Sequence, residues 1–590
     1  MMSLKTSRVA GAGLAVTLVC AVVAGVGATG ASAKAPKAGP SQPEVLYVGS
    51  VAGITTPASQ TFSTIQAAVS SAQKNDWILV APGDYHENDD AGITGSSPAV
   101  GSGYYGGVVI STSDIHLRGM NRNTVIVDGT ASSSPTSCSP AADEQNTLGG
   151  LGQNGIVVWK ANGVSIDNLT VCNFLAGSGN AGNEIWWNGG DGSGKVGLKD
   201  YSGSYLTATS TYFSNSDVNQ ANICGTCALY GIFSSNSKVG SWDQIYANNF
   251  SDSGAYVGAC HRACAVTINH AWFENNALGY SGTNSGGQVI IENSTFDNNK
   301  EGLDTNTALT GDPPPPQDGK CPGNKATATS QAVPGTNPTV NSCWVFMNNL
   351  VASNNDPNVP VSGTAGLGPT GTGMTISGGR DDTVLGNEFL NNGAWGILFA
   401  PYPDPNLSSD GKTCTKTGGL DVSAYAISGL NCLYDPEGDV LADNKFSGNG
   451  TLGNPSNADF GNLLGGGHEK DNCFVGNTEW NPSFTISSGP ATNADSIDGY
   501  SQLTPSTCGT RTPRSTPSLA GPNTDSTLLV QAECDAGVLS GSLCSSAHAD
   551  YPQATSVVME PLPTLASMPN PCQGVPTNLW CPGGVSVVRG

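Results

Sequence analysis

Short runs of alternating apolar and polar residues, separated by Gly, Asn or Asp, fill the chain between residues 155 and 476. The runs recur as one phrase that starts at Gly231, Gly254, Gly279 and Gly302, in steps of 23, 25 and 23 residues. Further copies start at Gly155, Gly373 and Gly396. The phrase lacks the apolar residues at every third or fourth position that a helical repeat needs. Short strands repeated at this interval are typical of one coil of a parallel β-solenoid, so we predict an all-β fold.

Stacking of the coils would turn each position of the phrase into a column along the solenoid axis. One column should point into the core; it contains Ile156, Ile232, Ala255, Leu303, Met374 and Ile397, and a second inward column contains Ile166, Ile268, Ile291 and Leu385. The column two residues after each starting Gly should point outward; it contains Val157, Phe233, Tyr256, Ser281, Asp304, Thr375 and Leu398. The repeated Asn residues suit turns with left-handed backbone, in which their amides can stack.

A different pattern precedes the repeat. Residues 62–87 combine a short amphipathic helix, with Ile65, Ala68 and Val69 on one face, with an alternating strand through Trp77, Leu79 and Ala81 and a Pro-Gly turn. The open end of a solenoid exposes apolar interior and unpaired strand edges, so a capping element is required there. We therefore expect residues 62–87 to form that cap.

The cap also carries a resemblance. Its residues Thr64-Ile65-Gln66, Ala67-Ala68-Val69, Asp76, Ile78, Val80, Pro82-Gly83, Tyr85 and Glu87 match a TIQxAVxxAxxxDxIxVxPGxYxE pattern. This segment resembles the N-terminal caps of right-handed parallel β-helix proteins of the pectin-lyase-like superfold. The resemblance implies that fold for the chain. It implies no single activity, because the superfold includes lyases, hydrolases, esterases, epimerases, tailspikes and adhesins.

The domain organisation follows from these patterns and from composition. Residues 1–33, with Lys5 and Arg8, an apolar run and Ala31-Ser32-Ala33, are typical of a secretory signal peptide, so we expect a secreted, extracellular protein. We expect the cap and first strands in 34–107, and the β-helix in 108–477 with loop insertions near 307–342 and 401–432. Residues 478–590, rich in Pro, Ser, Thr and Cys, should form a C-terminal extension.

Cysteine usage and charge narrow the classes of partner. Sixteen of the 17 cysteines follow the predicted signal peptide, and an even number in an exported chain favours disulfides. The pairs Cys224/Cys227 and Cys260/Cys264 also have the internal spacing of zinc ligands, which leaves a metal site as the alternative. The formal net charge of −23 disfavours nucleic acid and anionic lipid as partners, and no later segment is long and apolar enough for membrane insertion. We expect a monomer.

Two kinds of glycan cleavage fit the residues that should face outward. A lyase needs a base and a cation, for which His261, Arg262, Arg380 and Lys238 have the right chemistry. A hydrolase needs two carboxylates, for which the nearest candidates are Asp304, Glu301, Asp381 and Asp382. Our catalytic candidates are therefore Asp304, His261, Arg262, Arg380 and Asp381.

Aromatic residues supply candidates for substrate binding, because exposed rings bury the apolar face of a sugar. Tyr256 and Phe233 belong to the outward column, and Trp159 should face outward two residues further along its run. Trp186 and Trp187 are expected in a loop, and Lys238 in the adjoining turn. No cofactor is required, although Asp191 and Glu184 near that loop could bind Ca²⁺.

Resemblance to single enzyme families is incomplete. The QDT and DFIFG signatures of pectin methylesterases are absent, and Asp381-Asp382 with Gly467-His468 matches polygalacturonases only in part, because their NTD motif is missing. The leading hypothesis is a secreted enzyme that cleaves an extracellular polysaccharide by β-elimination or hydrolysis in a groove on the β-helix. The alternative is a non-catalytic surface or matrix protein that binds glycans or a partner.

Overall fold

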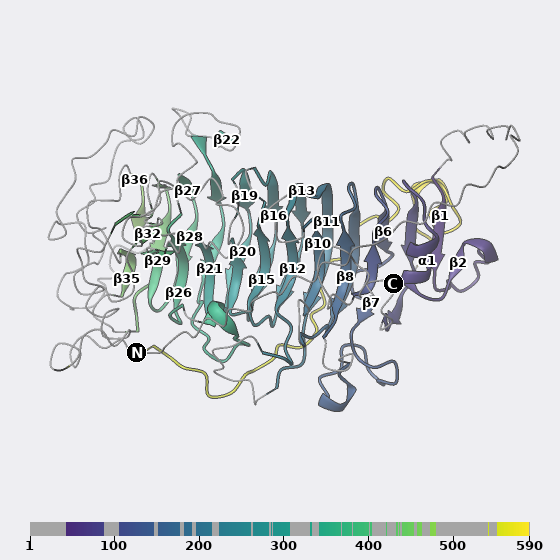
Figure 1. Ribbon diagram of the computed structural model, residues 1–590, viewed down its shortest axis with the longest axis horizontal. Helices are drawn as coiled ribbons and strands as arrows, with labels where there is room; N and C mark the ends of the chain where they lie inside the picture. The colour runs from purple at the N-terminus through teal and green to yellow at the C-terminus, as the bar shows by residue number, and fades with distance from the viewer. Residues whose placement is uncertain are drawn as a thin grey trace, which may run out of the picture. The chain divides into compact units, whose positions relative to one another are not determined.

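The computed structural model describes residues 43–588 with gaps at 88–105, 147–151, 178–181, 191–195, 215–223, 261–262, 283–284, 286, 307–330, 333–340, 367, 380, 401, 404–419, 422–431, 435, 437–438, 453–456, 463–472, 480–540 and 542–550. The chain divides after Pro43 into two units, and all the helices and strands named below belong to the second, Glu44–Gly590. Its strands wind into a right-handed parallel β-helix (Figure 1), which confirms the predicted fold.

Two long parallel sheets run along the axis. Within the described residues the first has ten strands: β5 (Gly106–Ile110), β8 (Asn154–Trp159), β10 (Asn183–Asn188), β12 (Tyr230–Ser235), β15 (Ser253–Gly258), β18 (Leu278–Ser281), β21 (Glu301–Asn306), β26 (Thr372–Ser377), β29 (Trp395–Ala400) and β35 (Ala458–Asn462). We refer to it as the ten-stranded sheet. After each of these strands, and before the next one in the sheet, the chain contributes one or two strands to the second sheet, so the coils contribute to both sheets.

The second sheet contains 22 described strands. They are β1 (Val45–Val48), β2 (Thr61–Phe62), β3 (Trp77–Val80), β4 (Gly83–Tyr85), β6 (His116–Gly119), β7 (Val125–Asp128), β9 (Ser165–Cys172), β11 (Leu198–Thr209), β13 (Ser237–Asp243), β14 (Tyr246–Asn248), β16 (Val266–Asn269), β17 (Trp272–Glu274), β19 (Val289–Glu292), β20 (Thr295–Asp297), β24 (Trp344–Met347), β25 (Leu350–Ala352), β27 (Asp382–Leu385), β28 (Glu388–Leu390), β33 (Val440–Ala442), β34 (Lys445–Ser447), β36 (Cys473–Val475) and β37 (Thr478–Glu479).

Small antiparallel pairings lie in the insertions, between β22 (Gln331–Ala332) and β23 (Asn341–Ser342), and among β30 (Tyr402–Pro403), β31 (Leu420–Asp421) and β32 (Cys432–Tyr434). The described helices are α1 (Ile65–Ser71), η1 (Ala58–Gln60), η2 (Ala142–Glu144), η5 (Gly363–Gly366) and η7 (Pro582–Gly584). No described helix is long and apolar enough to cross a membrane.

The predicted cap is present, and its matched polar residues have structural roles. Thr64 caps α1 by accepting a hydrogen bond from the amide of Ala67. The carboxylate of Glu87 accepts hydrogen bonds from the amides of Ile65 and Gln66, and so satisfies two further donors at the start of the helix. Asp76 similarly accepts from the amide of Gln73. The acidic positions of the pattern therefore hold the cap together.

The inward columns are confirmed with one exception. All predicted members are fully buried in the main core except Leu385, which is half-buried and packs against an outer apolar cluster with Val345 and Val440. The neighbouring Val384 takes the inward place instead, in register with Phe346. The prediction for Leu385 was wrong because both residues are apolar, so alternation alone does not say which one faces the core.

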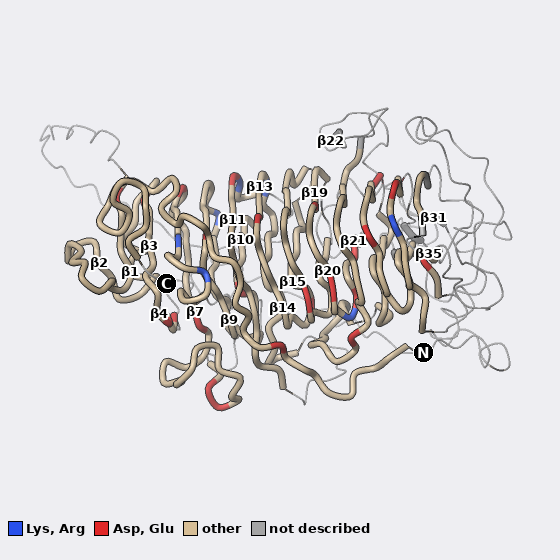
Figure 2. The backbone as a smooth tube through the Cα atoms, turned by 180° about the vertical axis from the view of Figure 1, so that it is seen from behind, with Lys and Arg blue, Asp and Glu red and all other residues tan. Residues whose placement is uncertain are grey.

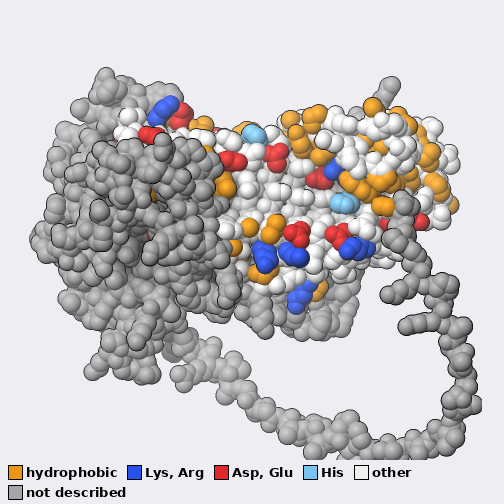
Figure 3. Space-filling view, turned by 90° about the horizontal axis from the view of Figure 1, so that it is seen from above, with side chains coloured by type: hydrophobic (Ala, Val, Ile, Leu, Met, Phe, Trp, Pro, Cys, Tyr) orange, Lys and Arg blue, Asp and Glu red, His pale blue; other side chains and the backbone are white. Residues whose placement is uncertain are grey.

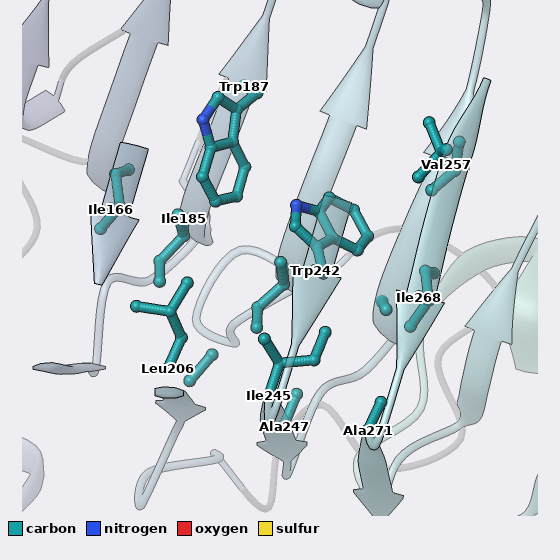
Figure 4. Close-up of a cluster of buried hydrophobic side chains, with 14 of the residues drawn as sticks. Ile166, Ile185, Trp187, Leu206, Trp242, Ile245, Ala247, Val257, Ile268 and Ala271 are labelled. Carbon is teal, nitrogen blue, oxygen red and sulfur yellow. The ribbon is translucent and has the colours of Figure 1, made fainter. Parts of the chain in front are cut away.

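A coil that the repeat did not reveal lies between the copies at Gly155 and Gly231. Residues 183–188, expected as a loop, form β10, which pairs in parallel with β8 and β12. Trp187 from β10 lies in the core with Trp242, their ring centroids 5.8 Å apart (Figure 4). The ring of Tyr201 also packs near Trp187, so three large aromatic residues share this part of the core.

Buried asparagines form ladders along the turns, as predicted from the repeats, but the left-handed backbone lies at the residue before each ladder member, for example at Asn275, Asn298 and Asn348. Within one ladder the side-chain amide of each residue donates to the side-chain oxygen of the next at 3.0 Å; its described members are Asn276, Asn299, Asn354, Asn392 and Asn449. A second ladder contains Asn349, Asn387, Asn444 and Asn477. These amides satisfy backbone groups that the turns would otherwise leave unpaired inside the protein.

Residues 551–588, which we call the strap, run back along the coils toward the N-terminal end (Figure 1, yellow). Side chains of turn residues bind its backbone; Asn249 and Asn123, for example, each exchange two hydrogen bonds with it. At its end, Trp580 packs against Tyr47 beside Leu79 and Ala81. The alternating strand of the cap is therefore buried on both faces, with Ile78 and Val80 in the main core.

Four disulfides join described cysteines: Cys138–Cys172, Cys224–Cys227, Cys260–Cys264 and Cys572–Cys581. The two pairs with zinc-like spacing are thus bonded within themselves. Their sulfurs are not thiolates that could hold a metal, so the disulfide interpretation is confirmed for these pairs.

Candidate functional site

The predicted outward column exists as a continuous row on the ten-stranded sheet. Register pairs connect Phe233 to Tyr256, Tyr256 to Ser281, Ser281 to Asp304, Asp304 to Thr375 and Thr375 to Leu398. Trp186 of the unpredicted coil enters the row between Val157 and Phe233. Residues far apart in sequence therefore follow one another at the strand spacing of about 4.8 Å.

One half of this row is aromatic. The rings of Trp186 and Phe233 are stacked with centroids 5.0 Å apart, and Phe233 meets Tyr256 edge-on at 4.7 Å. Tyr230, at the start of β12, stacks on Phe233 at 4.9 Å and contacts Tyr256 at 5.4 Å. We call Trp186, Tyr230, Phe233 and Tyr256 the aromatic cluster.

Tyr230 was missed by sequence reasoning because it precedes the starting Gly of its phrase, in a column that varies from coil to coil. Its hydroxyl donates a hydrogen bond to Asp252 at 2.9 Å. Burial raises the pKa of Asp252 to about 6, and the hydrogen bonds from Tyr230 and Ser253 partly oppose that shift. The Tyr230 ring is thus held at both ends, which keeps the cluster rigid.

The other half of the row contains the carboxyl group of Asp304, and Glu301 lies beside the row, three residues earlier on the same strand. We call Glu301 and Asp304 the acidic pair. Both are on β21, and Glu301 is only 3% exposed. The hydroxyl of Thr375, in the next coil, donates a hydrogen bond to Glu301. Burial raises the pKa of Glu301, and the charge of Asp304 raises it further, while Thr375 and Lys300 act in the opposite direction. Glu301 therefore favours the protonated form in the folded protein.

A segment before β26 forms a rim beside the acidic pair. Its residue Ser362 donates its amide to the carbonyl of Ser251 at 2.8 Å, and Ala365 packs against Leu278. The rim packs directly against Glu301 at Gly368. A Cβ added at this glycine would lie 2.0 Å from a carboxylate oxygen of Glu301, so a larger residue does not fit there. The ammonium group of Lys300 donates to the carbonyl of Gly368. The rim thus covers Glu301 on one side.

The structure brings only some of the predicted site residues together. Asp304, Tyr256, Phe233 and Trp186 share the row, whereas His261, Arg262 and Arg380 lie outside the described residues. Asp381 lies in the turn before β27, where it is 7% exposed and its carbonyl accepts the amide of Cys343. That turn leads into the 22-stranded sheet, so Asp381 is not part of the outward row.

Three predicted binding residues are placed differently. The prediction for Trp187 was wrong, because successive residues of a strand point to opposite faces and Trp186 takes the outward one. Trp159 is half-buried, with the ammonium group of Lys160 5.0 Å from its ring centroid. Lys238 is exposed on β13, in register with Lys199 on β11. Lys199 forms an ion pair with Asp200. Figure 3 shows basic side chains beside acidic ones on one face of the molecule.

The expected Ca²⁺ ligands do not form a described site. Glu184 lies inside the coil, fully buried, and accepts a hydrogen bond from the amide of Phe174 at 3.2 Å. Burial raises the pKa of Glu184 well above its ordinary value. Asp191 lies outside the described residues.

No protein-family model matches the chain, and no curated protein matches it in sequence. Solved structures are similar at low identity. The A-module of mannuronan C-5 epimerase AlgE6 from Azotobacter vinelandii is 12% identical, with 70% of this chain and 88% of that chain covered and a TM-score of 0.42. An exopolygalacturonase from Thermotoga maritima is 9% identical, with 69% and 80% covered and a TM-score of 0.35. The tailspike protein of E. coli bacteriophage HK620 is 10% identical, with 72% and 65% covered and a TM-score of 0.35.

Proposed function

We propose that this protein is a secreted carbohydrate-active enzyme that binds an extracellular polysaccharide along the outward row of the ten-stranded sheet and hydrolyses it at the acidic pair. One observation supports this most strongly: the aromatic cluster leads, coil by coil, through Ser281 to Asp304. A chain of sugars that stacks on the cluster would extend along the same row to two carboxyl groups.

Binding would use the aromatic cluster as a platform. Ring faces cover the apolar C–H face of a pyranose, and a rigid platform loses little conformational entropy when a ligand binds. Tyr256 is the member next to Ser281 and is partly exposed, whereas Trp186 is 4% exposed. Tyr256 is therefore the ring that we expect to contact the sugar nearest the acidic pair.

Cleavage would use the two carboxyl groups in different protonation states. Glu301, kept protonated by burial, is suited to donate a proton to the departing glycosidic oxygen. Asp304 would act as the second carboxylate, either by attacking the sugar or by activating water. Elimination would also need a cation at the site. Lys300 is the cation next to the acidic pair among the described residues, but its ammonium group donates to the carbonyl of Gly368, so elimination is less well supported.

A screen of polysaccharides distinguishes these possibilities. Purified protein is incubated with plant, algal and bacterial polysaccharides, while new reducing ends and ultraviolet-absorbing unsaturated ends are measured in parallel. Hydrolysis predicts reducing ends without added absorbance. A rise in absorbance would show elimination, and binding without either product would support the non-catalytic alternative.

Tyr256→Ala should raise KM about tenfold with little change in kcat, since one aromatic contact contributes about 1 kcal/mol or slightly more. Initial-rate kinetics on the polysaccharide found in the screen measure both constants. Tyr256→Phe keeps the ring and should bind as the wild type does. Equal losses in the two variants would show that the hydroxyl, and not the ring face, is responsible.

Glu301→Gln should lower kcat on the natural polysaccharide by a factor on the order of 10² to 10⁴. In the wild type, activity should fall as the pH rises through the raised pKa of Glu301, because the ionised carboxylate has no proton to donate. A substrate with an activated aryl leaving group needs no protonation, so Glu301→Gln should cleave it at nearly the wild-type rate. If the variant is equally slow on both substrates, or merely unfolds at lower temperature, Glu301 anchors the rim and is not the acid.

A further inference from the structure

A second cluster of chemically active side chains lies near the cap, away from the acidic pair. It consists of Asp84, on β4, His86, directly after β4, and Asp128, at the end of β7. Strands β4 and β7 pair in parallel, with Asp84 beside Ile126 and Tyr85 beside Val127, so this register places His86 next to Asp128. Figure 2 shows acidic residues close together at β4 and β7. One potential ligand atom from each residue lies within 4.8 Å of the other two.

We propose that Asp84, His86 and Asp128 form a binding site for a divalent transition-metal ion, for which Zn²⁺ has the best-matched chemistry. The donor set is one imidazole nitrogen and two carboxylate oxygens. Imidazole favours Zn²⁺ and its neighbours over Mg²⁺ and Ca²⁺, which prefer oxygen ligands alone. Three protein ligands would leave a fourth position for water. This proposal does not depend on the proposed glycan hydrolysis.

The orientation of the imidazole supports the assignment. Nδ1 of His86 lies 3.0 Å from the carbonyl oxygen of Thr130, which can only accept, so Nδ1 carries a proton. The other nitrogen, Nε2, faces Asp84. This is the arrangement that commonly fixes a metal-binding histidine, with one ring nitrogen donating to a carbonyl and the other directed at the ion.

The spacing between the ligand atoms also fits. Nε2 of His86 lies 3.5 Å from Oδ2 of Asp84. That distance is longer than a normal hydrogen bond, but it matches the separation of about 3.4 Å between two ligands of a tetrahedral ion with bonds of about 2.1 Å. An ion can therefore bind between these atoms with little movement of either side chain.

Neighbouring groups hold both carboxylates in place. The carboxylate of Asp128, which is fully buried, accepts the amides of Thr130 at 2.8 Å and Cys138 at 2.5 Å. Ser137 donates its hydroxyl to Asp84 at 2.7 Å. Such outer contacts orient the ligands of a metal site. Among the described residues, neither carboxylate forms an ion pair with Lys or Arg, and the ion-pair partner of Asp84 is His86, the third member of the cluster.

An alternative cluster nearby is less suitable. Asp128 also lies close to Cys138 and Cys172, but these two sulfurs are joined in a disulfide and are not thiolate ligands. In the proposed site, the Asp84 and His86 side chains are 29% and 14% exposed, so an ion can enter from solvent. A bound ion would connect β4 to the segment after β7, which includes η2.

The test is isothermal titration of Zn²⁺ into untagged, chelator-treated full-length protein. We expect one ion per chain, and at least tenfold weaker binding in Asp84→Asn. The matched control is Asp143→Asn, an exposed acid in η2, which should bind as the wild type does. Because Asp84 is partly exposed, its variant should fold, and thermal unfolding without metal checks this.

A second measurement identifies the ligands directly. Co²⁺ bound in place of Zn²⁺ should give the visible absorption of a four-coordinate site, and His86→Gln should remove it. The proposal is overturned if Zn²⁺ does not bind, if Asp84→Asn and Asp143→Asn bind it equally well, or if Ca²⁺ binds at this cluster and Zn²⁺ does not. If Zn²⁺ does not bind, then Asp84, His86 and Asp128 form only an ion pair and hydrogen bonds.

Discussion

Asp304→Asn should reduce turnover by a factor on the order of 10³ or more while leaving thermal unfolding unchanged. The substitution keeps the size of the side chain but removes the charge that the second carboxylate of a hydrolase needs. Asp304 is half-buried on the outward face, so its charge is not required by the main core. The measurement is the rate of release of reducing ends from the polysaccharide, with the unfolding midpoint recorded on the same samples.

The neighbour of Asp304 in the row provides the control. Ser281→Ala alters the preceding coil of the same column, and it should reduce the rate far less than Asp304→Asn. Removal of the negative charge should also lower the pKa of Glu301, because the charge of Asp304 is one cause of its elevation. Turnover that survives in Asp304→Asn would exclude Asp304 from catalysis and move the search to residues outside the described part of the chain.

Asn354→Leu should lower the free energy of unfolding by at least ~3 kcal/mol. The fully buried Asn354 side chain accepts from the backbone and side-chain amides of Asn299 and donates to the carbonyl of Phe296 and the side chain of Asn392. Leucine leaves these partners unsatisfied inside the protein, at a cost of about 1–3 kcal/mol for each such group. Urea unfolding followed by tryptophan fluorescence measures the change.

A half-exposed asparagine is the matched control. Asn269 also joins neighbouring coils, donating to Asp243 and accepting from Asn293, but water can replace these bonds. Asn269→Ala should therefore cost no more than about 1 kcal/mol. Similar losses in the two variants would show that burial does not determine how strongly the asparagine ladders stabilise the coils.

The stacking of the coils was predictable because the repeated phrase shows both the number of residues in a coil and the positions that point into the core. Steps of 23 or 25 residues superpose like positions, and the outward neighbours Tyr256, Ser281 and Asp304 follow from this directly. The acidic residues of the cap were recognisable from the matched pattern. The structure explains why the pattern needs them, because the carboxylates of Glu87 and Asp76 accept hydrogen bonds from backbone amides around α1.

Departures from the repeat were not predictable in the same way. The coil that contains β10 and β11 lacks the Asn-rich ending of the phrase, so Trp186 and Trp187 seemed to belong to a loop. Residues 183–188 do not alternate, because Ile185, Trp186 and Trp187 are three consecutive apolar residues. The sequence pattern therefore could not separate Trp186 from the buried Trp187. At Leu385 the pattern fails because the outer face of the sheet carries apolar residues here as well, and Leu385 packs beside Val345 and Val440 of the neighbouring coils.

Contacts between distant segments left no local trace in the sequence. The strap binds turns that lie far away in the sequence, as Leu565 does with Asn123, and Asp84 and His86 lie far in sequence from Asp128. Tyr230 was also missed, since only the packing against Phe233 and Tyr256 shows that it belongs to the aromatic cluster. Such sites require the register between strands, which alternation does not supply.

The proposed function requires a glycan chain to lie along the outward row, from the aromatic cluster to the acidic pair. A crystal structure of Asp304→Asn with an oligosaccharide of the polysaccharide identified in the screen tests this placement directly. We expect sugar rings over Tyr256 and a glycosidic oxygen within hydrogen-bonding distance of Glu301. An oligosaccharide bound on the 22-stranded sheet, or on the ten-stranded sheet away from Glu301, would contradict the proposed function.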